Sequence, residues 1–430
     1  MNSSGNDFKL RDILQKELIH TFFQPIVSLK TGSIFAYEAL VRGIRADSSA
    51  LINPVELFAR ADEETVSLEF DRLCRKKALE NFSDFHTKST AMMFMNINTS
   101  VISSSENEKP HISTITRQMG FNPEHIGLEL IESQARSADD LIDFVNHYRD
   151  SGFLIVIDDF GCEHSNLDRL IQIHPDIIKI DRSLISGIES DPYRQSILKS
   201  IHSLAEMTGS LCLAEGVETV AEIRTCNLLG VDLFQGFGIA CPSPDLQNLE
   251  TATLLQIRRV QEAIRKPTIE ALRQKRRLTG DINILADWLI RQISPDDFGS
   301  MNQVFQEFIA MNSEIECVYL LDGEGIQISD TIASPVVAGR SRPNIFYPAP
   351  RGTDHSFKVY FTCFEALGVH RYLTDVYLSL ASGNLCRTFS VLLASPDRTD
   401  FVLCIDFLEE TIRTPSGDMQ GFPYRLQGGT

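Results

Sequence analysis

Residues 153–159 have the sequence Phe-Leu-Ile-Val-Ile-Asp-Asp, a short apolar run that ends in two adjacent carboxylates. The run is rich in β-branched residues and predicts a buried strand. Similar runs occur at residues 177–181, Ile-Ile-Lys-Ile-Asp, and at residues 210–215, Ser-Leu-Cys-Leu-Ala-Glu. Buried strands of this kind are typical of a parallel sheet that is covered by helices.

Amphipathic segments with apolar residues near i, i+3 and i+4 separate most of these runs, for example Pro192–Thr208. About eight strand and helix units between Phe22 and Pro244 predict a closed (β/α)8 TIM-like barrel in the α/β class. Thr31-Gly32 lies between two strand-like runs and predicts a hairpin turn, so the first strand of the barrel should be antiparallel to the second. The predicted strands are Phe22–Leu29, Ser33–Val41, Ala91–Ile97, Ile126–Ile131, Phe153–Ile157, Ile177–Ile180, Ser210–Ala214 and Leu233–Gly236.

The pattern changes after Pro244. Thr251–Ile293 is almost continuously helical in character, and we expect Pro267 to break it. From Met301 the sequence predicts a helix and then an antiparallel sheet, with a hairpin between Ile315–Leu321 and Ile326–Ser329. The predicted domains are a barrel at residues 1–250, a helical linker at 251–293 and a smaller α+β domain at 294–430.

The length and composition exclude several classes of protein. A chain of 430 residues is too long for one small domain, and 43% hydrophobic with 23% charged residues is an ordinary globular balance. Forty Lys and Arg against 58 Asp and Glu give a net charge of −18, which disfavours nucleic acid as a partner. No apolar run approaches the ~20 residues that span a bilayer, so we expect no membrane span and a cytoplasmic protein. Nine scattered cysteines predict neither a disulfide framework nor a cysteine zinc site.

Polar residues stand at the ends of seven successive predicted strands, and in a parallel barrel these ends meet on one face. A single polar residue at a strand end is more often a helix N-cap. Polar residues at seven successive strand ends instead indicate a functional site. Crowded carboxylates repel one another unless divalent cations lie between them, and oxygen ligands suit Mg²⁺ or Mn²⁺. Adjacent Asp158 and Asp159 suit two ions about 3.5–4 Å apart, as in phosphoester hydrolysis. The residues are Glu38, Asn96, Glu129, Asp158 with Asp159, Lys179 with Asp181, Glu215, and Gln235.

These motifs resemble those of the EAL-domain cyclic di-GMP phosphodiesterases, in order, over roughly residues 18–245. The resemblance implies a barrel that linearises cyclic di-GMP to pGpG with two divalent cations, Mg²⁺ or Mn²⁺. The matching motifs are Tyr37-Glu-Ala-Leu-Val-Arg42, Met95-Asn-Ile-Asn98, Glu129-Leu-Ile-Glu132, Asp158-Asp-Phe-Gly161, Lys179-Ile-Asp181, Ala214-Glu-Gly-Val-Glu-Thr219 and Gln235-Gly-Phe237.

The resemblance also implies a role for each matching residue. The implied ligands of one metal are Glu38, Asn96, Glu129 and Asp158, and those of the second are Asp158 and Asp159. Lys179 is similar to the lysine that orients the attacking water, and Glu215 to a metal ligand or general base. The implied substrate contacts are Gln24, Arg42, Asp181 and Gln235, and the implied supporting residues, which hold the loop after Asp159, are Glu132 and Glu218.

Two departures from the family pattern leave alternatives open. Ile131 stands where the family usually has Thr, and Cys162-Glu163-His164 replaces a loop that is usually a small residue, Gly and an aromatic residue. One reading is an active, metal-dependent phosphodiesterase that its C-terminal domain regulates. The alternative is a module that binds cyclic di-GMP and hydrolyses it poorly. A metal-free scaffold would leave the strand-end carboxylates unexplained.

The C-terminal segment resembles the PAS/Cache-type sensor folds, which implies regulation by an unidentified small ligand or protein. Residues that would face a ligand there are equally well explained as core aromatics and surface arginines. They are Tyr360, Arg371, Tyr372, Tyr377 and Arg387. Barrels of this resemblance commonly pair through helices near the Asp-Asp-Phe-Gly loop, so we also expect a homodimer.

Overall fold

The computed structural model describes residues 8–45, 48, 50–86, 91–99, 102, 111–130, 137–161, 167–293, 298–335, 345–393 and 400–408. The chain divides into two compact units, Met1–Ile269 and Glu270–Thr430. Ile131, Glu132 and Cys162-Glu163-His164, which the sequence singled out, lie outside the described residues.

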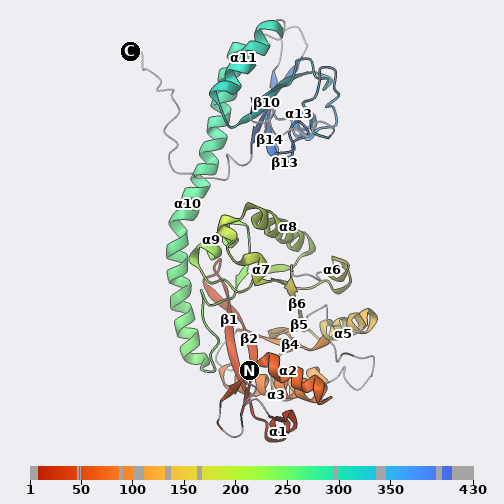
Figure 1. Ribbon diagram of the computed structural model, residues 1–430, viewed down its shortest axis with the longest axis vertical. Helices are drawn as coiled ribbons and strands as arrows, with labels where there is room; N and C mark the ends of the chain where they lie inside the picture. The colour runs from red at the N-terminus through yellow and green to blue at the C-terminus, as the bar shows by residue number, and fades with distance from the viewer. Residues whose placement is uncertain are drawn as a thin grey trace, which may run out of the picture. The chain divides into compact units, whose positions relative to one another are not determined.

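The first unit contains a closed barrel of eight strands, as the sequence predicts (Figure 1). Neighbouring strands follow the order β1-β9-β8-β7-β6-β5-β4-β2, and β1 pairs with β2 to close the ring. Strand β1 is antiparallel to both neighbours and the other six pairings are parallel, so the expected antiparallel first strand is confirmed. The strands are β1 (Ile19–Ser28), β2 (Ser33–Ile44), β4 (Met92–Ile97), β5 (Ile126–Leu130), β6 (Leu154–Phe160), β7 (Ile177–Ile180), β8 (Leu211–Ala214) and β9 (Leu233–Phe234), with β3 (Leu51–Ile52) beside β2.

Helices surround this barrel, and local sequence sets where they begin and end (Figure 1). Asp191 accepts hydrogen bonds from the backbone N–H groups of Tyr193 and Arg194 and so caps α8 at its start. Gly209 ends the same helix at a φ of 78°. The helices are α1 (Leu10–Lys16), α2 (Pro54–Glu63), α3 (Ser67–His86), α4 (His111–Gln118), α5 (Ala138–Asp150), α6 (Leu167–Ile173), α7 (Arg182–Ile185), α8 (Pro192–Thr208) and α9 (Val220–Leu228), with short 3₁₀ turns η2 (Pro123–His125) and η4 (Ile188–Ser190).

The barrel interior is a packed apolar core. Ile26, Phe94 and Val156 lie in one fully buried cluster with other strand residues. Phe94 fills this space so tightly that a Cβ at Gly127, on the next strand, would lie 2.5 Å from its ring. Because side chains fill the barrel, chemistry is confined to its open end.

Helix α10 (Leu246–Gln292) is continuous through Pro267, so the predicted break is wrong. A proline removes one backbone donor, but the residues around it are strong helix formers. In the same turn the Thr268 hydroxyl donates to the Ile264 carbonyl oxygen at 2.8 Å. The first half of α10 is part of the barrel unit, since Ile257 and Val260 are buried in the barrel's apolar core. None of the described helices, α10 included, has the length and apolar character that a membrane crossing requires.

The second unit is α+β with an antiparallel sheet, as expected. One sheet face packs Val318 and Ile405 against Phe305 and Phe308 of α11. The predicted hairpin is formed in part, because Leu321 on β10 pairs with Gln327 in an isolated antiparallel bridge and the backbone N–H of Ile328 donates to the Leu320 carbonyl oxygen at 2.9 Å. Strand β11 pairs farther along β10, at Cys317 and Val318. The elements are α11 (Phe298–Met311), β10 (Ile315–Asp322), β11 (Ile332–Ala333), α13 (Val359–Leu367), β12 (Arg371–Leu373), β13 (Tyr377–Leu378), β14 (Leu385–Leu393) and β15 (Phe401–Leu408).

Candidate active site

The register of the barrel brings the predicted strand-end residues to one face. Gln24 on β1 lies opposite Glu38 on β2 in the antiparallel pair. Asn96 on β4 is beside Glu129 on β5 in the parallel pair. The remaining polar residues lie on β6 and β7 or directly after β8 and β9, and they are Asp158, Lys179, Glu215 and Gln235.

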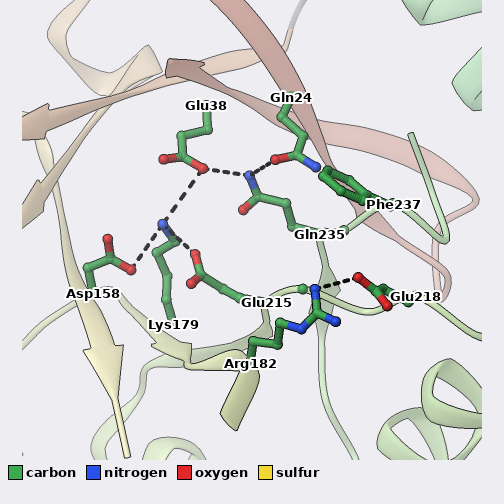
Figure 2. Close-up of a pocket in the computed structure, with 11 residues that line it drawn as sticks. Gln24, Glu38, Asp158, Lys179, Arg182, Glu215, Glu218, Gln235 and Phe237 are labelled. Atoms are coloured by element: carbon green, nitrogen blue, oxygen red, sulfur yellow. Dashed lines mark hydrogen bonds and ion pairs between the residues drawn. The ribbon is translucent and has the colours of Figure 1, made fainter. Parts of the chain in front are cut away.

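Lys179 lies among four carboxylates and is 1% exposed. Figure 2 shows Glu38, Asp158 and Glu215 around its side chain. Its Nζ is 2.5 Å from Glu215 Oε1, 3.0 Å from Glu129 Oε1, 3.1 Å from Asp158 Oδ1 and 3.9 Å from Glu38 Oε2. Burial acts to lower the pKa of this amine, but the four carboxylates raise it well above its usual value. Lys179 therefore stays charged and neutralises part of the cluster.

Two amides and the lysine hold Glu38. Gln235 Nε2 donates to Glu38 Oε2 at 2.5 Å and to Gln24 Oε1 at 3.3 Å, and Asn96 Nδ2 donates to Glu38 Oε1 at 3.0 Å. Burial acts to raise the pKa of Glu38, but Lys179 and the two amide donors outweigh it and the pKa is lowered. Glu38 is thus a fixed, ionised carboxylate.

Glu129 is completely buried, and its carboxylate has few partners for its hydrogen-bonding capacity. Apart from its ion pair with Lys179, neither carboxylate oxygen has a hydrogen-bond partner in the described part of the chain. Burial, followed by the nearby charge of Glu38, raises the pKa of Glu129 well above its usual value. A native protein seldom leaves a buried carboxylate in this state without a cation to bind it.

The adjacent aspartates complete an oxygen-rich donor set. One carboxylate oxygen each from Asp158, Asp159 and Glu215 lie within 4.8 Å of one another. Asp159 has a φ of 56°, which is uncommon for a residue with a Cβ, and its backbone N–H donates to Asp158 Oδ1 at 3.0 Å. This turn, together with the unsatisfied oxygens of Glu129, fits divalent cations that prefer hard oxygen ligands.

The same cluster should make the stability of the metal-free protein depend on pH. Burial raises the pKa of Glu215 to about 8, well above the ordinary value of 4.5. Between these two values the folded protein binds more protons than the unfolded chain, so the free energy of unfolding falls as pH rises. In EDTA we expect the thermal midpoint to be lower at pH 8 than at pH 6, and Mn²⁺ to remove most of the difference. Glu215→Gln should flatten the profile in EDTA, and an unchanged slope in this variant would contradict the assignment.

A cavity of about 250 Å³ opens over the cluster (Figure 2). The predicted residues that line it are Gln24, Glu38, Asp158, Lys179, Glu215, Glu218 and Gln235. Arg182 and Phe237 also line it. Phe237 belongs to a matching motif but has no predicted role, and Arg182, which directly follows Asp181, was missed by the sequence interpretation. Arg182 forms an ion pair with Glu218, and Phe237 is 62% exposed. A Cβ at Gly216 would lie 2.8 Å from the Arg182 side chain, so glycine is what allows this arrangement.

Two predicted substrate contacts do not line this cavity. Arg42 Nη1 donates to the carbonyl oxygen of Val41 at 2.7 Å, and its guanidinium lies 5.6 Å from the centre of the Phe22 ring. Asp181 accepts a hydrogen bond from the backbone N–H of Ser183 at 2.8 Å and caps α7. The roles implied for Arg42 and Asp181 therefore stay predictions, as does the role of Glu218 in holding the loop after Asp159.

Curated relatives match the barrel. The chain is 28% identical over 240 residues to the probable cyclic di-GMP phosphodiesterase PdeB of Escherichia coli (strain K12), covering 55% of this chain and 45% of that protein. It is 31% identical over 243 residues to the cyclic di-GMP phosphodiesterase PdeF of the same organism, covering 55% and 32% respectively. The chain therefore spans less than half the length of these two relatives. The uncharacterized EAL-domain containing protein YkuI of Bacillus subtilis (strain 168) is 24% identical over 381 residues, covering 86% and 90%.

The crystal structure of YkuI in complex with substrate c-di-GMP and calcium superposes with a TM-score of 0.72 at 22% identity, covering 94% of this chain and 99% of that one. At this identity the likeness shows a shared fold. The EAL enzyme Bd1971, in its cAMP and cyclic di-GMP bound form, has a TM-score of 0.51 at 26% identity over 57% of this chain and 67% of that one. The family model for the EAL domain matches residues 9–242, which is more than half of the chain. The protein therefore belongs to the EAL-domain family.

Proposed function

We propose that the barrel is a phosphodiesterase that hydrolyses cyclic di-GMP to linear pGpG with two divalent cations, Mg²⁺ or Mn²⁺. The observation that carries the proposal is the ring of carboxylates around buried Lys179 at the floor of an open cavity. The names of the relatives PdeB and PdeF, and the cyclic di-GMP bound to Bd1971, support this substrate.

In this proposal each residue of the donor set has a task. Glu38, Asn96, Glu129 and Asp158 would hold one ion, and Asp158 with Asp159 the second. When bound, these ions would acidify a water molecule and stabilise charge on the phosphodiester. Lys179 keeps its neighbouring carboxylates in place through its ion pairs.

Glu215 would act as the general base. It lines the cavity, and one of its carboxylate oxygens lies within 4.8 Å of oxygens of Asp158 and Asp159, so it is within reach of a water molecule that these residues would hold. The water oxygen bonds to phosphorus while its proton passes to Glu215. The bond from phosphorus to the 3′ oxygen breaks, and that oxygen takes up a proton to become a hydroxyl. The product keeps a 5′ phosphate, as pGpG does.

Arg182 is our candidate for a further substrate contact. Lys179 is enclosed by carboxylates, whereas the Arg182 side chain is 51% exposed and lines the cavity. A charge-assisted hydrogen bond is worth about 1.5–3 kcal/mol, so Arg182→Ala should raise KM for cyclic di-GMP by roughly 10- to 100-fold. Steady-state kinetics measure this effect. Arg194→Ala, which removes an exposed arginine on α8, is the control, and a KM for Arg182→Ala equal to that of the control would contradict the contact.

We also propose that the barrels pair as a homodimer and that the C-terminal unit regulates them. Leu167 and Ile171 form an exposed apolar pair one turn apart on α6, the first described helix after the Asp-Asp-Phe-Gly segment near which the resemblance implies pairing. Leu167→Glu with Ile171→Glu should shift the sedimentation coefficient of the full chain from dimer to monomer. The matched pair Val55→Glu and Met207→Glu, on α2 and α8, should leave it unchanged. A monomeric wild-type protein would contradict the pairing.

One assay separates hydrolysis from capture. Purified full-length protein is incubated with cyclic di-GMP and either Mg²⁺ or Mn²⁺, and chromatography follows both nucleotides while equilibrium dialysis measures binding. We expect pGpG to accumulate only with metal. Binding with no pGpG would favour the capture module that Ile131 and Cys162-Glu163-His164 leave open.

A further inference from the structure

The second unit contains a cavity of about 610 Å³, far from any residue of the proposed active site in the chain. It lies between one face of the sheet and α13. A pocket of 300–1,000 Å³ is the usual size for binding a small organic molecule. The residues that line it are Asp322, Gly323, Glu324, Phe361, Phe364, Glu365, Leu392, Asp400 and Val402.

The floor of this cavity is apolar. Leu392 on β14 and Val402 on β15 are direct cross-strand partners. Phe361 and Phe364 lie three residues apart on α13, are only partly buried, and pack against the same apolar cluster as Leu392. The two aromatic rings and the strand residues therefore offer an organic ligand a surface to cover.

The rim of the cavity is acidic. Among the lining residues that the structure describes, four are carboxylates and none is Lys, Arg or His. None of the four forms an ion pair with a cation in the part of the chain that the structure describes. A Cβ at Gly323 would lie 3.3 Å from the Asp400 carbonyl oxygen, so the turn after β10 and the start of β15 approach closely and bring acidic residues together. The carboxylates are Asp322, Glu324, Glu365 and Asp400.

The spacing of these carboxylates does not suit a metal ion. Among the described residues, three ligand atoms within 4.8 Å of one another occur only in the barrel, at Asp158, Asp159 and Glu215. Carboxylates around a wide apolar floor instead complement a ligand that is both positively charged and apolar. Aromatic rings add to this complementarity, because a cation near an aromatic face gains about 0.5–2 kcal/mol.

We propose that this cavity binds a small organic cation, an ammonium group joined to an apolar or aromatic body. The ammonium lies among the carboxylates of the rim, and the body covers Phe361, Phe364, Leu392 and Val402. The site is independent of the proposed hydrolysis, because all its residues belong to the second compact unit. It gives the C-terminal unit a class of ligand to recognise.

The test uses full-length protein in EDTA and isothermal titration with 2-phenylethylamine, which is a cation at neutral pH. Its matched control is 2-phenylethanol, which has the same ring and chain length without the charge. We expect saturable binding of one amine per chain and at least tenfold weaker binding of the alcohol. Raising the salt concentration from 50 to 500 mM should weaken amine binding, since screening acts on the acidic rim. No saturable binding, or equal binding of amine and alcohol, would overturn the proposal.

Variants locate the bound amine. Glu365→Gln and Asp400→Asn are exposed rim substitutions, and each should weaken binding about fivefold or more. Asp375→Asn, an exposed carboxylate outside the cavity, should leave binding unchanged. Phe364 is partly buried, so Phe364→Ala can also destabilise the fold. The thermal midpoint of this variant is therefore measured without amine, and weaker amine binding counts only if that midpoint equals the wild-type value. Binding that survives the Glu365→Gln, Asp400→Asn double variant would place the amine elsewhere and refute the site.

Discussion

Glu38→Gln should abolish the metal-dependent hydrolysis of cyclic di-GMP. Glutamine keeps the shape of the side chain that Gln235 and Asn96 hold, but it removes the negative charge that a divalent cation requires. Loss of several kcal/mol of charge stabilisation corresponds to a fall in kcat/KM of about 10³-fold or more. The variant should also lose most of the rise in thermal midpoint that Mn²⁺ gives to the wild type.

The folded state of Glu38→Gln should survive this change. Lys179 retains three closer carboxylates, so the cluster stays paired in the variant. The lowered pKa of Glu38 means that its charge stabilises the folded state, so in EDTA the midpoint should fall modestly while the protein stays folded. Glu206→Gln, an exposed change on α8, is the control and should behave as the wild type in both measurements. Wild-type turnover or a full Mn²⁺ response in Glu38→Gln would show that Glu38 is no ligand.

Glu215→Gln should separate catalysis from binding. Positioned general bases contribute about 10²–10⁴-fold to rate, so we expect kcat to fall by that amount. KM should change only a few-fold, because Gln24, Gln235, Arg182 and Phe237 remain to contact the substrate. Rapid-quench kinetics of product formation, together with dialysis of cyclic di-GMP against the inactive variant, measure the two effects separately.

A structural role for Glu215 would produce a different result. Its carboxylate lies 2.5 Å from Lys179 Nζ, so a purely structural carboxylate would disturb the whole cluster when replaced. In that case KM would rise while kcat falls, and the thermal midpoint with Mn²⁺ would fall toward that of the metal-free protein. Loss of binding in proportion to loss of turnover would therefore contradict the role of base.

Much of the site could be predicted because parallel strands impose a simple rule. Glu129, Asp158 and Lys179 end successive strands, and the closed sheet carries their side chains to one face whatever the loops do. Thr31-Gly32 specified the antiparallel first pair through turn chemistry alone. These features depend on local sequence and on strand direction, which the sequence displays.

The features that the sequence did not predict depend on contacts between distant parts of the chain. Pro267 is a helix breaker by local rules, yet α10 continues because its neighbours favour helix and its first half is anchored on the barrel. Arg182 lines the cavity because Gly216 leaves room for its stem, a contact between segments far apart in the chain. The residues that line the cavity of the second unit likewise come from β10, α13, β14, β15 and their turns. No single stretch of sequence therefore predicts this cavity.

Single-turnover hydrolysis tests the central claim most directly. Full-length protein in excess over cyclic di-GMP, with Mn²⁺, is quenched at intervals and the nucleotides are separated by chromatography, so that even a slow enzyme reveals its product. We expect complete conversion to pGpG by the wild type, and none in EDTA or with Glu38→Gln. The contradicting result is that the wild type binds all the cyclic di-GMP and the nucleotide is recovered intact at every time point. The barrel would then be a capture module that does not hydrolyse its ligand.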